Sequence, residues 1–155
     1  MIIDERVLTS FIPGMEIRVY SKDDEPAVVR LWREVFSGAP AWNDPATDIK
    51  RKMAIQSNLF FVAVIDSTVV GTAMSGYDGH RGWVYYVGVD PNHRRKGIGR
   101  ALMERVEREL AAIGCPKLNL QVRASDSEVI DFYRKLGYQV EARVSMSRLL
   151  PAAYK

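Results

Sequence analysis

The sequence has one cysteine, Cys115, among its 155 residues, which excludes an internal disulfide and fits a reducing compartment. It also lacks any apolar run near the ~20 residues that a membrane-spanning helix needs. Asp4, Glu5 and Arg6 stand where a signal peptide would be apolar. Two separated histidines and one cysteine form no metal-ligand cluster. We therefore expect a cytoplasmic protein that binds neither membrane nor metal.

The chain also lacks internal repeats, low-complexity runs and a Gly/Ser-rich or Pro-rich linker, which favours a single domain. Hydrophobic residues make up 47% of the sequence, enough for a core without disulfides. We place the domain at residues 15–150, with an N-terminal extension at 1–14 and a C-terminal tail at 151–155. A monomer and a homodimer both fit these observations.

Hydrophobic periodicity predicts alternating strands and helices. Residues 15–20, 59–66, 68–77, 83–89 and 117–122 have strand-like patterns, and 138–150 predicts one or two final strands. Helices are expected from about Ser21 to about Ser37, from Asn43 or Asp44 to about Ser57, over 97–113 and over 126–136. This order predicts a mixed α/β fold, a central sheet with flanking helices.

The net charge of the chain is +3, and its basic residues concentrate in one segment between His93 and Arg100. This run follows the strand 83–89, contains Gly97 and Gly99, and leads into the helix 97–113. Glycines let a ligand approach the backbone, and the free N–H groups at a helix start favour anions. We therefore predict a site for a diphosphate-type ligand.

Other phosphate loops fit less well. Leu102 occupies the third glycine position of a dinucleotide-binding pattern, and the glycine-lysine-serine/threonine sequence of a Walker A loop is absent. A plain helix cap remains the structural alternative. A nucleic-acid contact is the weaker interpretation of this loop, since nucleic-acid-binding proteins usually carry a broad basic face. We therefore expect no nucleic-acid partner.

Two motifs carry a family resemblance. Arg94-x-x-Gly97-x-Gly99 resembles the Gln/Arg-x-x-Gly-x-Gly/Ala motif of the Gcn5-related N-acetyltransferase (GNAT) superfamily. Phe132-Tyr133-x-x-x-Gly137-Tyr138 is similar to its second motif, at a fitting interval. Several short segments, Trp42-Asn-Asp-Pro45 among them, resemble the small bacterial YpeA-type acetyltransferases.

The resemblance implies an N-acetyltransferase that moves an acetyl group from acetyl-CoA to a primary amine, on a small molecule or a protein. It implies a GNAT fold and a coenzyme A site with these members: Val87, Val89, Arg94, Arg95, Lys96, Gly97, Ile98, Gly99, Arg100 and Asp126. Val87 and Val89 would bond the pantetheine through their backbone. Asp126 stands where the family often has Asn, and it also suits the N-cap of the last helix.

Tyr133 is the catalytic residue that the resemblance implies, as proton donor to the departing thiolate in a direct, ternary-complex transfer. A core aromatic is the alternative role for this residue. A non-catalytic CoA or acyl-CoA-binding regulatory module is the alternative function. Cys115 has no neighbouring histidine in the sequence, which argues against a covalent intermediate.

The acceptor and the general base stay open in the sequence. Candidate acceptor-site residues lie before the second helix and around the turn 78–81: Trp42, Asn43, Tyr77, His80 and Tyr85. The base candidates are Asp78, His80, Tyr85, Tyr86 and Glu128, and a water relay is a further option.

Overall fold

The computed structural model describes residues 12–154, so most of the predicted extension 1–14 lies outside the described residues. Five strands form one sheet in the order β1-β2-β3-β4-β5. Their bounds are Met15–Val19 (β1), Phe60–Ile65 (β2), Thr68–Tyr77 (β3), Gly82–Val89 (β4) and Leu118–Asn119 (β5). The helices are Glu25–Val35 (α1), Pro45–Met53 (α2), Ile98–Ala112 (α3) and Ser127–Lys135 (α4). The predicted mixed α/β architecture is confirmed.

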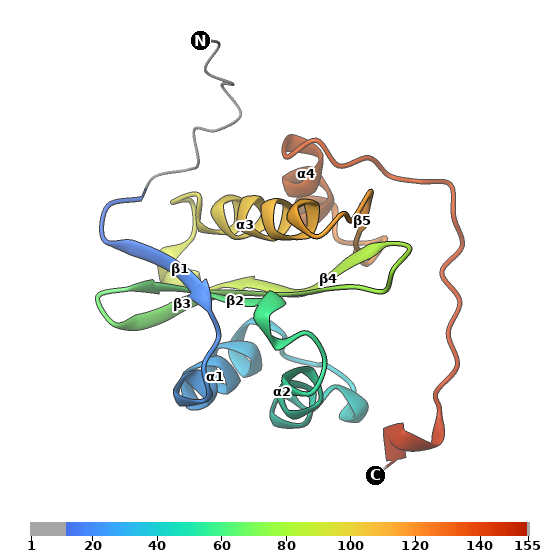
Figure 1. The fold of residues 1–155 in the computed structure, drawn as a ribbon, viewed down its shortest axis with the longest axis horizontal. Coiled ribbons are helices and arrows are strands. Elements are labelled where there is room, and N and C mark those ends of the chain that lie inside the picture. Colours follow the sequence, from blue (N-terminus) through green and yellow to red (C-terminus); the bar gives the residue numbers. More distant parts are fainter. Residues whose placement is uncertain (1–11, 155) are drawn as a thin grey trace.

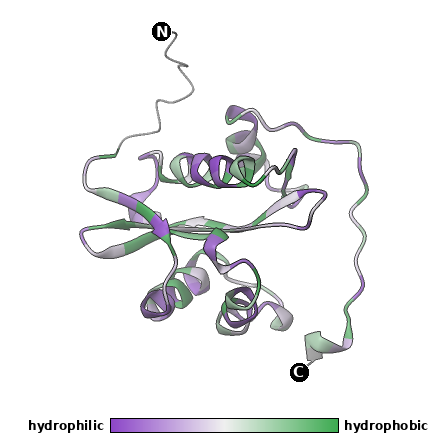
Figure 2. Cartoon of the chain, in the orientation of Figure 1, coloured by the Kyte–Doolittle hydropathy of each residue, from purple (hydrophilic) through white to green (hydrophobic). Residues whose placement is uncertain are grey.

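The sheet separates two helical layers. In Figure 1, α3 and α4 lie above the sheet and α1 and α2 lie below it. Strand β2 is buried on both faces, because Phe61 and Ala63 pack towards α3 whereas Phe60 and Val62 pack towards α1 and α2. The helices mix hydrophobic and hydrophilic residues (Figure 2), and the residues that each of them buries are mostly hydrophobic. Two cores therefore hold β2 and β3 from opposite sides.

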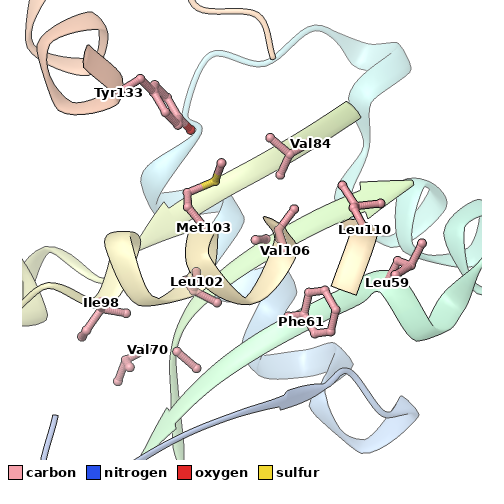
Figure 3. Close-up of a cluster of buried hydrophobic side chains, with 12 residues drawn as sticks. Leu59, Phe61, Val70, Val84, Ile98, Leu102, Met103, Val106, Leu110 and Tyr133 are labelled. Atoms are coloured by element: carbon pink, nitrogen blue, oxygen red, sulfur yellow. The ribbon is translucent and has the colours of Figure 1, made fainter. Parts of the chain in front are cut away.

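The core above the sheet joins α3 and α4 to the strands (Figure 3). Leu102, Met103 and Val106 of α3 are fully buried against the sheet. Tyr133 reaches down from α4 into the same cluster, with its hydroxyl end directed away from α4 (Figure 3). This core therefore fixes α3 and Tyr133 relative to β4.

Local signals set most of the boundaries. Asp44 caps α2, since its carboxylate accepts a hydrogen bond from the Thr47 backbone N–H at 3.1 Å. Asp66 and Ser67 both adopt positive φ, the conformation of a tight hairpin turn, and they join β2 to β3 as predicted. Helix α2 ends at Met53 and not near Ser57, because Gln56 takes a left-handed conformation.

The prediction of final strands over 138–150 is wrong in this structure, and β5 is shorter than the predicted strand 117–122. The physical reason is the same in both cases. A strand needs a backbone partner, and within residues 12–154 no sheet ladder extends beyond the pairs that β5 makes with β4. The pattern of residues 138–150 is that of a strand, but the segment runs along the outside of the domain without a partner (Figure 1).

Candidate active site

The sheet opens between β4 and β5. The two strands pair in parallel only at Gly82 with Leu118 and at Trp83 with Asn119. From Val84 to Val89, β4 has its ladder partner on the β3 side alone among the described strands. The free edge of β4 can therefore accept hydrogen bonds from, or donate them to, an extended ligand.

The predicted basic loop lies at the end of this free edge. Arg94, Arg95 and Lys96 are exposed, and Gly97 is the N-cap of α3 without a side chain to cap the helix. Arg95 and Gly97 have φ values of 63° and 81°, so the backbone turns sharply before the helix starts. Because α3 is 15 residues long, its N-terminus offers free N–H groups and a favourable dipole to an anion.

Gly99 has a packing role that the sequence alone did not indicate. A Cβ at this position would lie 3.1 Å from Cζ of Phe132 on α4. The absence of a side chain therefore lets α3 and α4 approach each other, and it brings the two predicted motifs together in space. Ile98 is buried beneath the loop, while Arg100 is exposed and pairs with Glu104 at 3.0 Å.

Tyr133 is only 9% exposed. Its ring packs edge-on against Phe132 and Tyr138, and burial raises the pKa of its phenol to about 12. The hydroxyl therefore stays protonated across the neutral range. Tyr138, by contrast, donates its hydroxyl to Glu107 on α3 at 2.7 Å, which ties the end of α4 to that helix.

Asp126 lies at the start of α4, as its N-cap. Its carboxylate accepts a hydrogen bond from the Val129 backbone N–H at 3.3 Å. A carboxylate in this position satisfies one of the free N–H groups of the helix. The structural role predicted for Asp126 is therefore observed.

Beneath the sheet, Tyr86 marks an irregularity in β4. The pairing of β3 with β4 shifts register here, and Tyr86 has a positive φ of 51°, which is strained for a residue with a side chain. Its ring stacks on Trp32 with 3.7 Å between ring centroids. Thr72 fixes the bulge, because its hydroxyl accepts from Trp32 Nε1 and donates to the Tyr86 carbonyl.

The Tyr86 hydroxyl donates a hydrogen bond to Asp48 on α2. Burial and this carboxylate raise the pKa of Tyr86 well above its usual value. Burial also raises the pKa of Tyr85. Both phenols are therefore protonated at neutral pH, which argues against either as the general base.

A cavity of about 180 Å³ adjoins the Tyr86 bulge. Trp32, Phe36 and Tyr86 form its aromatic wall, and Asn43 and Pro45 close it from the segment before α2. Of the predicted acceptor-site residues, Asn43 thus lines a cavity beside β4. Trp42, its neighbour in a 3-10 turn, is 45% exposed. Asp48 was missed by sequence reasoning, because it lies 38 positions from Tyr86 and the sequence gives no local signal for the pair.

Tyr77, Asp78 and His80 lie at the other end of β4. His80 is exposed in the turn 78–81, and Tyr77 bonds its hydroxyl to the Gly79 carbonyl at 3.2 Å. The eight residues of β4 separate this turn from the basic loop, about 25 Å at ~3.3 Å per residue. Glu128 lies exposed in the first turn of α4. The structure therefore divides the predicted residues between a phosphate end, a central cavity and a distal turn.

Comparison with known proteins decides the family. The profile described as "Acetyltransferase (GNAT) family" matches residues 25–138. This protein belongs to the GNAT family. An acetyltransferase from Yersinia pestis (strain Pestoides F) is 45% identical over 136 residues, which cover 88% of this chain and 96% of that protein. An acetyltransferase from Sodalis glossinidius is 48% identical over 130 residues, which cover 84% of this chain and 91% of that protein.

Solved structures agree with the fold. Ard1 from Thermoplasma volcanium superposes with a TM-score of 0.72 and 25% identity, covering 83% of this chain and 85% of that one. An aminoglycoside N-acetyltransferase, AAC(6')-Iy, in complex with CoA superposes with a TM-score of 0.72 at 19% identity, over 90% and 99% of the two chains. The GNAT fold is thus confirmed, and the protein is an acyltransferase by family.

None of the helices within residues 12–154 is both long and apolar enough to cross a bilayer. Over the same residues, no three His, Cys, Asp or Glu side chains gather in a way that could hold a metal ion.

Proposed function

We propose that this protein transfers an acetyl group from acetyl-CoA to a primary amine by direct attack in a ternary complex. One observation carries the proposal: β4 parts from β5 after Trp83 and leads to a basic loop at the start of α3. Tyr133 packs in the same apolar cluster as Val84, at the beginning of the open edge. The molecule thus combines a phosphate end, a free strand edge and a buried phenol along a single strand.

The residues present fit coenzyme A. Arg94, Arg95, Lys96 and Arg100 would face its phosphates, with the backbone N–H groups of residues 97–100. The backbone of Val87 and Val89 would bond the amide-containing pantetheine arm as an added strand. Asp126 already accepts from Val129 and would contribute little to this site.

Acetyl-CoA supplies a thioester, whose carbonyl carbon takes the amine nitrogen while the carbon–sulfur bond breaks. A backbone N–H near Val87–Val89 would stabilise the oxygen as it gains charge. Tyr133 would give its phenolic proton to the departing sulfur and regain one from solvent, while the new amide nitrogen loses one. A pKa of about 12 keeps Tyr133 in the donor form.

The amine would approach from the side of the Tyr86 cavity. The aromatic wall of Trp32, Phe36 and Tyr86 offers ring faces, which attract a cation. Since Tyr85 and Tyr86 stay protonated, water or Asp78, His80 or Glu128 would have to take the amine proton. The catalysed rate should therefore rise with pH towards the acceptor pKa, ~10.4 for a lysine-like amine.

The test is thiol release from acetyl-CoA with a panel of amines, alongside thermal melting with CoA. Replacing Tyr133→Phe should lower kcat about 100-fold, the lower range for loss of a general acid. The CoA-induced rise in melting temperature should remain. Tyr138→Phe is the matched control, because it removes a neighbouring hydroxyl that bonds Glu107 and should leave turnover intact.

The outcomes separate the competing functions. CoA binding without thiol release for any amine would favour a non-catalytic CoA-binding module. If CoA failed to raise the melting temperature at saturation, the proposed cradle would be wrong. Equal kcat in wild type and Tyr133→Phe would assign Tyr133 to packing alone.

A further inference from the structure

Strand β4 carries a bulge at a point where its other edge is open. Its register with β3 sets Tyr86 and Val87 opposite the single residue Ala73. The pairing of β4 with β5 has already ended at Trp83. A bulge takes peptide groups out of the regular ladder and redirects them. The peptide group between Tyr86 and Val87 therefore lies beside the opening in an irregular part of the strand.

The backbone of the bulge is held in a strained conformation. Tyr86 has a φ of 51°, which a residue with a side chain adopts only where its surroundings hold it. The ring of Tyr86 is held by stacking on Trp32, and its hydroxyl donates to Asp48. Its carbonyl accepts a hydrogen bond from Thr72 Oγ1 at 2.7 Å. Both the side chain and the backbone of Tyr86 are thus anchored beneath the sheet.

The Thr72 hydroxyl is held in a single direction. Thr72 is fully buried, and its Oγ1 accepts a hydrogen bond from Trp32 Nε1 at 2.8 Å. Because an indole N–H can only donate, the hydroxyl proton is left for the Tyr86 carbonyl. Trp32 is itself buried in the core below the sheet. This chain of two hydrogen bonds fixes the plane of the peptide group that joins Tyr86 to Val87.

The same peptide group carries the N–H of Val87. A peptide group is planar and trans, so its C=O and N–H point in opposite directions. The Tyr86 carbonyl points towards Thr72 on β3. The Val87 N–H therefore points away from β3, to the side on which β5 has parted from β4.

We propose that Thr72 is a positioning residue for acyl transfer and acts through the Val87 N–H. This inference rests on the proposed function, in which the thioester oxygen gains negative charge as the amine attacks. A donor that is fixed before the reaction stabilises this charge without reorganisation. Thr72 is fully buried, so it touches neither the thioester nor the amine. Its hydroxyl directs the Val87 N–H at the thioester oxygen, and the Val87 carbonyl remains for the pantetheine arm.

Steady-state thiol release, with the amine that reacts fastest, compares two substitutions of Thr72. Thr72→Val removes the hydroxyl and keeps the branched shape, whereas Thr72→Ser keeps the hydroxyl. Thr72→Val should lower kcat at least ~10-fold and change the KM for acetyl-CoA less than ~3-fold, because the donor acts on the transition state. Thr72→Ser should restore kcat to within ~3-fold of the wild type. Thr72→Ala, which also lacks the hydroxyl, should behave like Thr72→Val.

Ser75→Ala is the matched control for a merely structural effect. Ser75 also lies on β3 and is buried, and its Oγ donates to the Leu59 carbonyl at 2.7 Å. Leu59 directly precedes β2, on the side of β3 that faces away from β4. Ser75→Ala and Thr72→Val each deprive a backbone carbonyl of a buried donor, so both should lower the melting temperature. Only Thr72→Val should lower kcat. Wild-type kcat in Thr72→Val, or an equal loss in Ser75→Ala, overturns the proposal.

Amide resonances of isotope-labelled protein separate this proposal from the transfer reaction itself. The Val87 amide proton should move downfield when CoA is replaced by acetyl-CoA, because only acetyl-CoA carries the thioester oxygen. The shift should occur in wild type, Thr72→Ser and Ser75→Ala, and it should be lost in Thr72→Val. This pattern without thiol release for any amine would support the positioning by Thr72 and refute the proposed transfer. A shift that persists in Thr72→Val, or is absent in wild type, overturns the positioning role.

Discussion

The two ends of the sheet differ in how fully the strands are paired. Strands β1 to β4 pair along most of their length and are covered by helices on both faces. From β5 onwards, two ladder pairs hold the sheet, and residues 139–150 have none. Strand-like patterns occur in both regions. The difference teaches that alternation of apolar and polar residues indicates which face of a strand is to be buried. Whether the strand pairs depends on a neighbouring backbone, which the pattern does not reveal.

The largest expected effect is in the well-paired region. Phe61 of β2 is fully buried, and the Arg105 guanidinium lies 5.1 Å from its ring centroid. Replacing Phe61→Ala should lower the free energy of unfolding by about 3–5 kcal/mol, because it leaves a cavity between the sheet and α3. Urea unfolding measures this. A loss below ~1 kcal/mol would mean that the core collapses around the site and that the well-paired region is less rigid than its pairing suggests.

An intermediate effect is expected where β1 meets α1. Asp24 accepts hydrogen bonds from Arg18 at 2.7 and 2.8 Å and from the Ser21 backbone, and these hold the pKa of its carboxyl below the usual value. The stabilisation is therefore present above the unfolded pKa, ~3.9, and is lost as pH falls through the lower folded pKa.

Asp24→Asn should cost about 1–2 kcal/mol near neutral pH, a range reduced because Arg18 is partly exposed. The difference in unfolding free energy between wild type and variant should shrink between about pH 4 and pH 2. Urea midpoints at several pH values measure it. A difference that stays constant over this range would mean that the ion pair contributes nothing specific.

The smallest effect should come from the poorly paired region. Val144→Ser changes a side chain that is 87% exposed in the single chain. It should alter the free energy of unfolding by less than ~0.5 kcal/mol, as urea unfolding would measure. A larger loss would show that the segment packs on its own domain.

The elements with strong local signals were predictable from the sequence. The periodic helix 97–113, the cap at Asp44 and the hairpin turn at Asp66-Ser67 lie where the sequence indicates. The short β5 within residues 117–122 and the absence of strands in residues 138–150 could not be predicted, because periodicity does not reveal the backbone partners of a strand. The shortened α2 depends on a left-handed Gln56, a residue type that gives no warning of that conformation.

The site shows the same division. The basic loop and its glycines are contiguous in the sequence, so an anion cradle could be predicted from them. The Asp48–Tyr86 hydrogen bond and the contact between Gly99 and Phe132 join distant positions. Only the packing of α2 beneath β4 and of α4 against α3 brings these residues together.

The register of β1 has a consequence for the order in which the molecule forms. Strands β2, β3 and β4 follow one another through short turns, whereas β1 pairs Met15 with Ile65 across both lower helices. Closing so long a loop is slow compared with forming a hairpin. We expect refolding to begin in the β2–β4 meander, with β1 joining afterwards, and stopped-flow fluorescence of Trp83 on β4 and Trp32 on α1 would resolve the two stages. A single common phase would contradict this order. The edge strand that opens the described chain would then be the last to dock during folding.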